Sequence, residues 1–201
     1  MTHTRKAIAT RKRIIDCAAV LITNEGFSRM RLEEVLQASQ VQKGNFYYYF
    51  RSKDELGLAV LVENLDPAAR HWLQGLLHED GEPWADLQQL PDRLSTALAR
   101  EDGALTVANQ LAQDLCRAGG DFHSRAGEVL RALAGVLVER FERLQTTGRL
   151  TAAANPVQLG EFLASAIDGA LFWQCLTGDS SLIGPTLSLA LAGVTQFIRP
   201  A

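Results

Sequence analysis

The residues best suited to a chemical role lie together in residues 42–50, where glutamine, lysine, glycine and asparagine precede an aromatic run. A cation beside a phenol suits a phosphate, and a glycine lets the backbone approach it closely. A glutamine amide can read the edge of adenine. By contrast, no His, Cys and carboxylate cluster has metal-ligand spacing, and neither a G-x-S-x-G motif nor a glycine-rich phosphate loop occurs. The sequence therefore favours nucleic-acid binding over an enzyme and calls for no metal or cofactor.

Helical spacing separates this segment into two faces. Phe46 and Phe50 share one side of a helical wheel, whereas Gly44 and Tyr48 point the opposite way and Asn45 lies to one side. We expect the phenylalanines to pack inward and the opposite face to be offered outward. The outward face would then carry the contacts to a partner.

The tyrosines have two interpretations. Tyr47 lies on the flank beside Lys43, one turn earlier, so the two side chains can reach the same phosphate. The alternative is that Tyr47, Tyr48 and Tyr49 only cover the joint with the first helix of the chain.

Three short helices would position these residues: about 5–24, 32–38 and 43–49, with a tight turn at Val41. This layout matches a DNA-binding helix-turn-helix. Ser52 and the glutamate three residues later have capping-box spacing, so the next helix begins there. We therefore divide the chain into a helix-turn-helix domain, 1–51, and a larger helical domain, 52–201.

Charge divides along the same line. Residues 1–53 hold ten Lys and Arg against four Asp and Glu, a balance of +6. The remaining 148 residues hold ten Arg and nineteen acids, a balance of −9. Only a nucleic-acid-binding head needs to neutralise phosphates, so this segregation supports the same function. Arg5, Lys6 and the run 11–13 can add phosphate contacts or form a solvated basic face.

The rest of the chain also has helical periodicity, so we expect an all-α fold. One helix runs to about His78, with a kink or break at Asp66-Pro67. Further helices are expected at 84–100, 104–118, 123–147, 156–177 and 183–198. The last two are apolar around so much of their circumference that they must be buried on several sides. They can be buried in the domain core or across a subunit interface, and we expect a four-helix interface with a symmetry mate.

Composition sets the cellular context. Hydrophobic residues make up 47% and charged residues 21% of the 201 residues, as in an ordinary globular protein. No apolar run is long enough to span a membrane, and the polar start lacks the apolar core of a signal peptide. Three cysteines without paired spacing argue against disulfides and zinc. These features indicate a cytoplasmic protein with no membrane contact.

Residues Thr10 to Leu61 resemble the TetR family of bacterial transcription regulators. The resemblance rests on Ile14-Ile15-Asp16-Cys17-Ala18-Ala19, on Glu25-Gly26-Phe27 and on the segment from Val41 to Leu56. It implies a homodimeric repressor that holds two heads in successive major grooves of a palindromic operator. It also implies that 52–201 is a ligand-binding and dimerisation domain, and that the repressor leaves the operator when a small molecule binds there. Helix 43–49 would be the recognition helix.

By position, the resemblance implies that Lys43, Tyr47 and Tyr48 contact phosphates or base edges and that Gly44 and Asn45 lie close to the DNA. Lys53 would touch the DNA backbone beyond the recognition helix.

Three positions depart from the family pattern. Met30 and Arg31 stand where Thr or Ser usually caps the second helix, so Ser28 would have to cap it slightly earlier. Arg31 can gain a DNA contact instead. Gln40 replaces the usual turn glycine, and Gln42 replaces a serine before Lys43. We expect these changes to alter the sequence of the operator that is recognised more than the ability to bind DNA.

The effector site is predicted less sharply. The segment Lys43–Phe50 followed by Gly57-Leu58-Ala59-Val60 is similar to family members that control electrophile and enoate detoxification, so we expect a small, largely apolar or electrophilic effector. Large apolar groups on the central helices line such cavities. The candidate set is Trp72, Trp84, Leu111, Leu115, Cys116, Phe141, Asp168, Phe172 and Trp173.

Several members of that set have a second interpretation. The apolar ones can be ordinary core. Cys116 can sense electrophiles if Arg117 favours its thiolate, or be a buried, inert cysteine. Asp168 can bind a polar ligand group or pair across the dimer, and so can His71 and His123; alternatively, each is a locally hydrogen-bonded or exposed side chain. For the whole chain, the alternative function is a helical protein-binding adaptor with a basic head, which would not need outward tyrosines.

Overall fold

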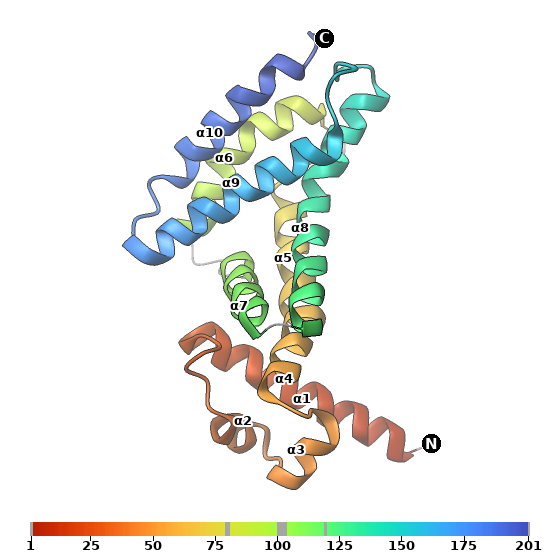
Figure 1. Ribbon diagram of the computed structural model, residues 1–201, viewed down its shortest axis with the longest axis vertical. Helices are drawn as coiled ribbons and strands as arrows, with labels where there is room; N and C mark the ends of the chain where they lie inside the picture. Colours follow the sequence, from red (N-terminus) through yellow and green to blue (C-terminus); the bar gives the residue numbers. More distant parts are fainter. Residues whose placement is uncertain (1, 79–80, 100–103, 119, 201) are drawn as a thin grey trace. The chain divides into compact units, whose positions relative to one another are not determined.

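The computed structural model describes residues 2–78, 81–99, 104–118 and 120–200, and most of them are helical (Figure 1). The α-helices are α1 (Thr2–Glu25), α2 (Leu32–Ser39), α3 (Lys43–Tyr49), α4 (Lys53–Val60), α5 (Asp66–Gly75), α6 (Pro83–Ala99), α7 (Ala104–Ala118), α8 (Gly120–Thr146), α9 (Pro156–Thr177) and α10 (Ile183–Val194). A π-helical turn, η1 (Leu61–Leu65), and a 3-10 turn, η2 (Thr195–Phe197), complete them. The expected all-α fold is confirmed.

The chain forms two compact units. Unit 1 comprises Met1–Ala68 and Ala104–Leu130, and unit 2 comprises Ala69–Gly103 and Arg131–Ala201. The unit that contains α1 to α3 is thus larger than residues 1–51, because α4, η1 and α7 also pack on α1. The functional boundary at residue 51 stays a proposal.

Most helix ends follow local sequence signals. Gly26, with φ of +84°, follows the end of α1, and Phe27 is buried beside it, as the Gly-Phe pair predicts. Ser52 caps α4 by accepting the Glu55 N–H at 3.0 Å. The Glu55 carboxylate accepts from the N–H of Arg51 at 2.6 Å, one residue earlier than a capping box requires. Residues 100–103 and 119, which fall at the ends of the helices expected at 84–100 and 104–118, lie outside the described residues.

The long helix is interrupted before Pro67 rather than at it. In η1 the N–H of Asp66 donates to the carbonyl of Leu61, five residues earlier. Pro67 is the second residue of α5 and has no N–H to give to a preceding carbonyl. The expected irregularity is present, and its form is a π turn followed by a new helix.

The last helix is shorter than the sequence predicts. It ends at Val194 instead of residue 198, and η2 follows. The backbone then pairs with the segment after α8: Thr151 N–H donates to Phe197 and Arg199 N–H donates to Arg149. These bonds form the isolated antiparallel bridge between Leu150 and Ile198. Because the pairing partner is about fifty residues away in sequence, the local apolar periodicity could not predict where α10 ends.

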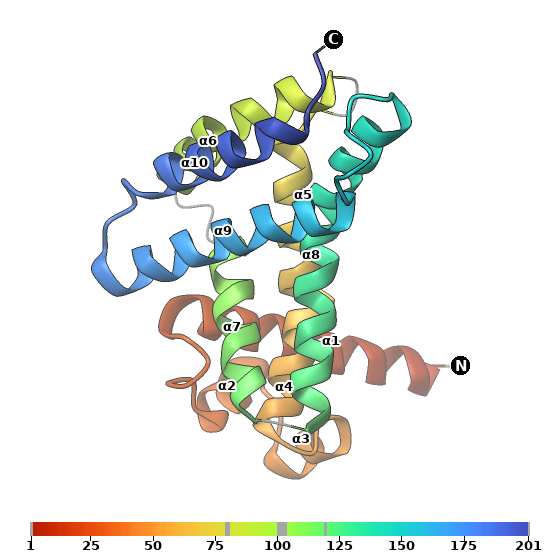
Figure 2. The ribbon, with the colours of Figure 1, turned by 45° about the horizontal axis from the view of Figure 1, so that its top comes forward.

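In unit 2, α10 packs against α6 and α9, and Figure 2 shows the three helices running beside one another. Helix α9 also approaches α8 closely, and a glycine makes this possible. A Cβ on Gly160 of α9 would lie 2.6 Å from the backbone nitrogen of Val138 on α8, so only hydrogen fits there.

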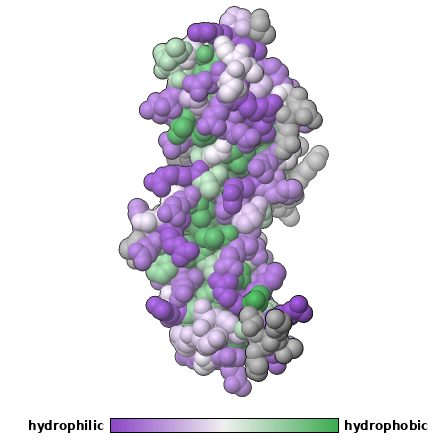
Figure 3. Space-filling model, turned by 90° about the vertical axis from the view of Figure 1, so that its right-hand side faces the viewer, coloured by the Kyte–Doolittle hydropathy of each residue, from purple (hydrophilic) through white to green (hydrophobic). Residues whose placement is uncertain are grey.

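Figure 3 shows a face of the molecule on which hydrophilic residues predominate and hydrophobic ones are interspersed. No helix in the described ranges is both long and apolar enough to cross a bilayer.

Candidate nucleic-acid interface

The turn between α2 and α3 is made by Gln40 and Val41. Gln40 adopts a left-handed conformation with φ of 53°, and the Val41 N–H donates to the Leu36 carbonyl at 3.0 Å. A left-handed backbone costs an L residue about 1–2 kcal/mol, which explains why glycine is usual at such a turn. Val41 is buried and anchors the turn. The departure at Gln40 therefore leaves the helix-turn-helix intact.

Helix α3 has the two faces that its spacing predicts. Phe46 and Phe50 are 0% and 1% exposed, and their ring centroids lie 5.6 Å apart. Tyr48 is 77% exposed and Tyr47 is 48% exposed. Tyr49 is half-buried, with its ring edge-on to Tyr48. Tyr47 and Tyr48 therefore point outward, as the first interpretation requires, and Tyr49 is the least exposed of the three.

The outward face is open around Gly44. A Cβ built there would meet no heavy atom of the chain within 4 Å. Packing therefore does not require glycine at this position, whereas close approach of a partner would. Gln42, Lys43 and Asn45 are exposed beside it. This arrangement offers a cation, two amides and two phenols on one side of the head.

The start of α2 lacks a side-chain cap. Arg31 occupies the N-cap position, and its backbone N–H donates to Glu34 at 3.0 Å. Ser28, which the sequence suggested as a substitute cap, instead hydrogen bonds to Asp114 of α7 at 3.2 Å. The Arg31 side chain is exposed.

Lys53 is engaged within unit 1. Its ammonium donates to the Ser28 carbonyl at 3.3 Å and lies 4.7 Å from the centroid of the Phe27 ring. These contacts hold the start of α4 against the loop after α1. In this conformation, a phosphate contact from Lys53 would share the ammonium with Ser28.

The basic residues of α1 differ in availability. Arg11 makes a two-pronged ion pair with Glu63 of η1, at 2.6 and 2.7 Å, and covers the Phe50 ring at 5.2 Å. Lys12 pairs with Asp16 at 2.8 Å. Arg5, Lys6 and Arg13 are exposed. Arg11 thus joins α1 to η1, and Lys12 is paired on its own helix.

Comparison with known proteins agrees with this geometry. A model of the bacterial regulatory proteins of the tetR family matches residues 14–60, from within α1 to the end of α4. The transcriptional regulator AcuR of Cereibacter sphaeroides is 32% identical over 157 residues, which cover 75% of this chain and 69% of AcuR. This chain belongs to the TetR family.

A second relative extends the likeness to the whole fold. The repressor NemR of Escherichia coli K12 is 29% identical over 160 residues, which cover 77% of this chain and 78% of NemR. The crystal structure of reduced E. coli NemR matches with a TM-score of 0.70 and 28% identity, over 96% of this chain and 100% of that one. TetR regulators are not enzymes. Within the described residues, no cluster of three metal-binding side chains occurs.

The predicted effector residues of this TetR regulator fall into both units. In unit 1, Leu111 and Leu115 of α7 are buried, and Cys116 is half-buried. Two hollows in unit 1, of about 90 and about 520 Å³, include none of these three residues.

The candidates in unit 2 differ in exposure. Trp84 and Phe141 are buried, and Trp72 is half-buried. Phe172 and Trp173 are 46% and 51% exposed on α9, so they face outward rather than into the core of unit 2. Trp84 and Phe141 therefore remain candidates for lining a cavity, whereas the outward aromatic side chains suit an interface.

Asp168 is the acidic member of the predicted effector set. It lies on α9, and burial raises the pKa of its carboxyl to about 6. A carboxyl with this pKa changes charge just below neutral pH. His71 and His123, named with it as candidates for polar ligand groups, are both exposed.

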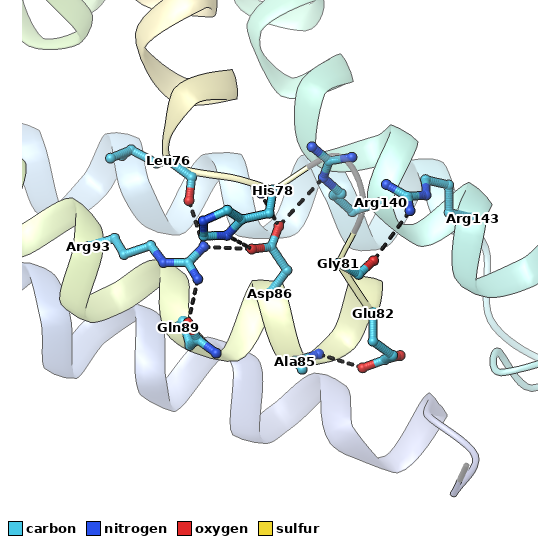
Figure 4. A network of polar contacts seen from close by, with 10 residues as sticks. All are labelled: Leu76, His78, Gly81, Glu82, Ala85, Asp86, Gln89, Arg93, Arg140 and Arg143. Carbon is cyan, nitrogen blue, oxygen red and sulfur yellow. Dashed lines mark hydrogen bonds and ion pairs between the residues drawn. The ribbon is translucent and has the colours of Figure 1, made fainter.

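Sequence reasoning missed a polar network in unit 2 (Figure 4). Asp86 of α6 is 4% exposed; it accepts from the His78 N–H at 2.9 Å and from Arg93 at 2.5 Å, and pairs with the His78 ring at 3.1 Å. Burial raises the pKa of Asp86, but the hydrogen bonds from Arg93 and His78 together outweigh it and lower the pKa below its ordinary value. Arg140 of α8, also 4% exposed, lies 3.9 Å from the same carboxylate.

The sequence contained a signal for this network. Arg140 follows Val136 and Leu137 by four and three residues and precedes Leu144 by four, which places it on the core face of α8. Its burial agrees with this position and excludes the alternative that Arg140 belongs to the solvated charges between the apolar residues. A charge within a core stripe marks a buried polar contact rather than a solvated face.

Proposed function

We propose that this TetR-family regulator is a ligand-controlled repressor. Two copies would hold their helix-turn-helix heads in successive major grooves of a palindromic operator. A small, largely apolar or electrophilic effector would bind the C-terminal body and release the DNA. The observation that carries the DNA-binding part is the outward pair Tyr47 and Tyr48 beside exposed Lys43 and open Gly44.

Each residue of the head has a proposed role. Lys43 and Tyr47 bind phosphates, while Tyr48 and Gln42 contact base edges. Gly44 and Asn45 lie against the DNA. Arg31 contacts the backbone from the start of α2, and Lys53 does so from α4 by leaving or sharing the Ser28 carbonyl.

The dimer would form through α9 and α10. These helices leave large apolar side chains on the surface of an isolated copy, which is unfavourable in water. The exposed set is Val157, Phe162, Phe172, Trp173, Leu176, Leu182 and Leu189. Two copies of each helix would bury this set in a four-helix interface, in line with the two-fold symmetry of a palindromic site.

The effector would bind within the body, either among Trp72, Trp84 and Phe141 of unit 2 or among Leu111, Leu115 and Cys116 of unit 1. Asp168 is a candidate for a polar group of the effector. Phe172 and Trp173, predicted for the same site, fit the proposed dimer interface because they point outward.

The first experiment is selection of bound sequences from a random duplex pool, followed by titration of the best site at two salt concentrations. We expect a palindromic site bound by a dimer. Lys43→Ala should weaken binding to all sequences and reduce the salt slope by about 1, whereas Tyr48→Ala should cost more on the selected site than on others. Arg131→Ala is the matched control, since Arg131 is an exposed cation on α8, outside the helix-turn-helix.

Either of two results would contradict the proposal. Unselective binding that disappears evenly with salt would reduce the head to a basic surface and favour the helical adaptor. Parental binding by both Lys43→Ala and Tyr48→Ala would show that α3 is not the recognition helix.

A further inference from the structure

Arg140 carries a fixed positive charge into the core of unit 2. It lies on the face of α8 that holds Leu137, Phe141 and Leu144, and only 4% of it is exposed. A guanidinium stays protonated at any pH that the fold survives and has five N–H donors in a planar fork. Burial of such a group is strongly unfavourable unless an anion and hydrogen-bond acceptors compensate it.

The compensation around Arg140 is incomplete. No described residue accepts a hydrogen bond from its Nε, and the ion pair of its guanidinium with Asp86 spans 3.9 Å. That carboxylate already accepts from His78 and, at 2.5 Å, from Arg93. Two guanidinium groups thus share one carboxylate. Arg143, one turn further along α8, donates instead to the Gly81 carbonyl at 3.3 Å.

The orientation of the Arg140 side chain allows its guanidinium to bind a second anion. Figure 4 shows the Nε of Arg140 toward Asp86 and its two terminal nitrogens pointing away from that carboxylate. A carboxylate fits two parallel N–H groups of a guanidinium. A singly charged carboxylate also loses less hydration on burial than a doubly charged phosphate. Leu137, Phe141 and Leu144 on the same face of α8 are buried and apolar, so the surroundings of Arg140 favour a ligand that carries a single charge on an otherwise apolar molecule.

We propose that Arg140 is the anchor for the carboxylate of the effector, a small organic acid with an apolar body. This inference rests on the proposed ligand-controlled function and specifies the chemical class of the ligand. Asp86 lies beside the anchor but is paired more closely with Arg93, so the positive charge of Arg140 is only partly compensated. The charge of the effector would complete the pairing.

The test uses the full chain and two matched pairs of probes: sodium butyrate with butyramide, and sodium benzoate with benzamide. Sodium chloride at equal ionic strength is the baseline. We expect at least one carboxylate to raise Tm in a concentration-dependent way and to bind in calorimetry, while its amide does neither. Arg140→Met should weaken that binding about ten- to hundredfold, because a charge-assisted bidentate contact is lost.

Controls separate the anchor from general charge and from misfolding. Arg131→Met removes an exposed arginine of the same helix and should bind the carboxylate like the parent. Arg140→Lys keeps the charge without the fork and should give intermediate affinity. Arg140→Met should fold, because Asp86 keeps Arg93 and His78 as partners.

Three results would overturn the proposal: no carboxylate of the panel raises Tm, the amide stabilises as well as the acid, or Arg140→Met binds the acid as tightly as the parent. A separate measurement distinguishes the site from the function. A carboxylate that binds through Arg140 but leaves operator affinity unchanged would support the anchor and refute ligand-controlled release.

Discussion

Replacing Gly44 by alanine should move the stability of the free protein and its affinity for DNA in opposite directions. The added methyl group would meet no atom of the chain within 4 Å, so it introduces no clash. Alanine in a helix is more favourable than glycine by about 0.8–1 kcal/mol, and by about half of that near the first turn. For a chain of this length, the corresponding rise in Tm is roughly 1–4 °C.

The effect on DNA binding follows from the same open space. If a phosphate approaches the backbone at Gly44, the methyl group displaces it and weakens at least one charge-assisted hydrogen bond, at a cost of about 1.5–3 kcal/mol. The dissociation constant should then rise about ten- to hundredfold. Fluorescence anisotropy on the selected operator measures this change, and thermal melts without DNA measure stability.

The matched control is Gly135→Ala on α8, where a Cβ also meets nothing within 4 Å. It should stabilise the fold and leave operator affinity unchanged. Gly57→Ala is the opposite case, because its Cβ would lie 2.5 Å from the Phe27 ring, and it should destabilise the fold by about 1–3 kcal/mol. Parental affinity in Gly44→Ala would refute the inference that this face of α3 lies against DNA.

Three further predictions concern other parts of the chain. Gln40→Gly relieves the left-handed strain at φ of 53° and should raise stability by about 0.5–1 kcal/mol in thermal melts; no gain would show that the turn is unstrained. Trp173→Asp puts a charge on the exposed face of α9 and should convert dimer to monomer in light scattering, and a stable dimer would place the interface elsewhere. Asp168 has its pKa raised from 3.8 to about 6 in the folded state, so the folded state binds more protons than the unfolded state between these values. Stability should therefore fall as pH rises through this window, and Asp168→Asn should flatten the profile; parallel curves would show that another group is responsible.

Local signals were sufficient for the head. The two faces of α3 follow from helical periodicity alone, so the sequence predicted the burial of Phe46 and Phe50 and the exposure of Tyr48. Ser52 at the start of α4 is a local cap, and its hydrogen bond to Glu55 needs no distant residue. Such interactions join residues within a few positions of each other, which is why the sequence by itself specified the helices and the family of this protein.

Contacts between distant residues had to come from the tertiary structure. The early end of α10 depends on pairing of residues 197–199 with residues 149–151. Phe172 and Trp173 are apolar by sequence, but only packing decides that they point outward on α9. Arg140 lies 3.9 Å from Asp86, more than fifty positions earlier in the chain, and only the fold brings these two charges together. The free energy of a buried charge depends on its surroundings in space, and one-dimensional periodicity does not contain them.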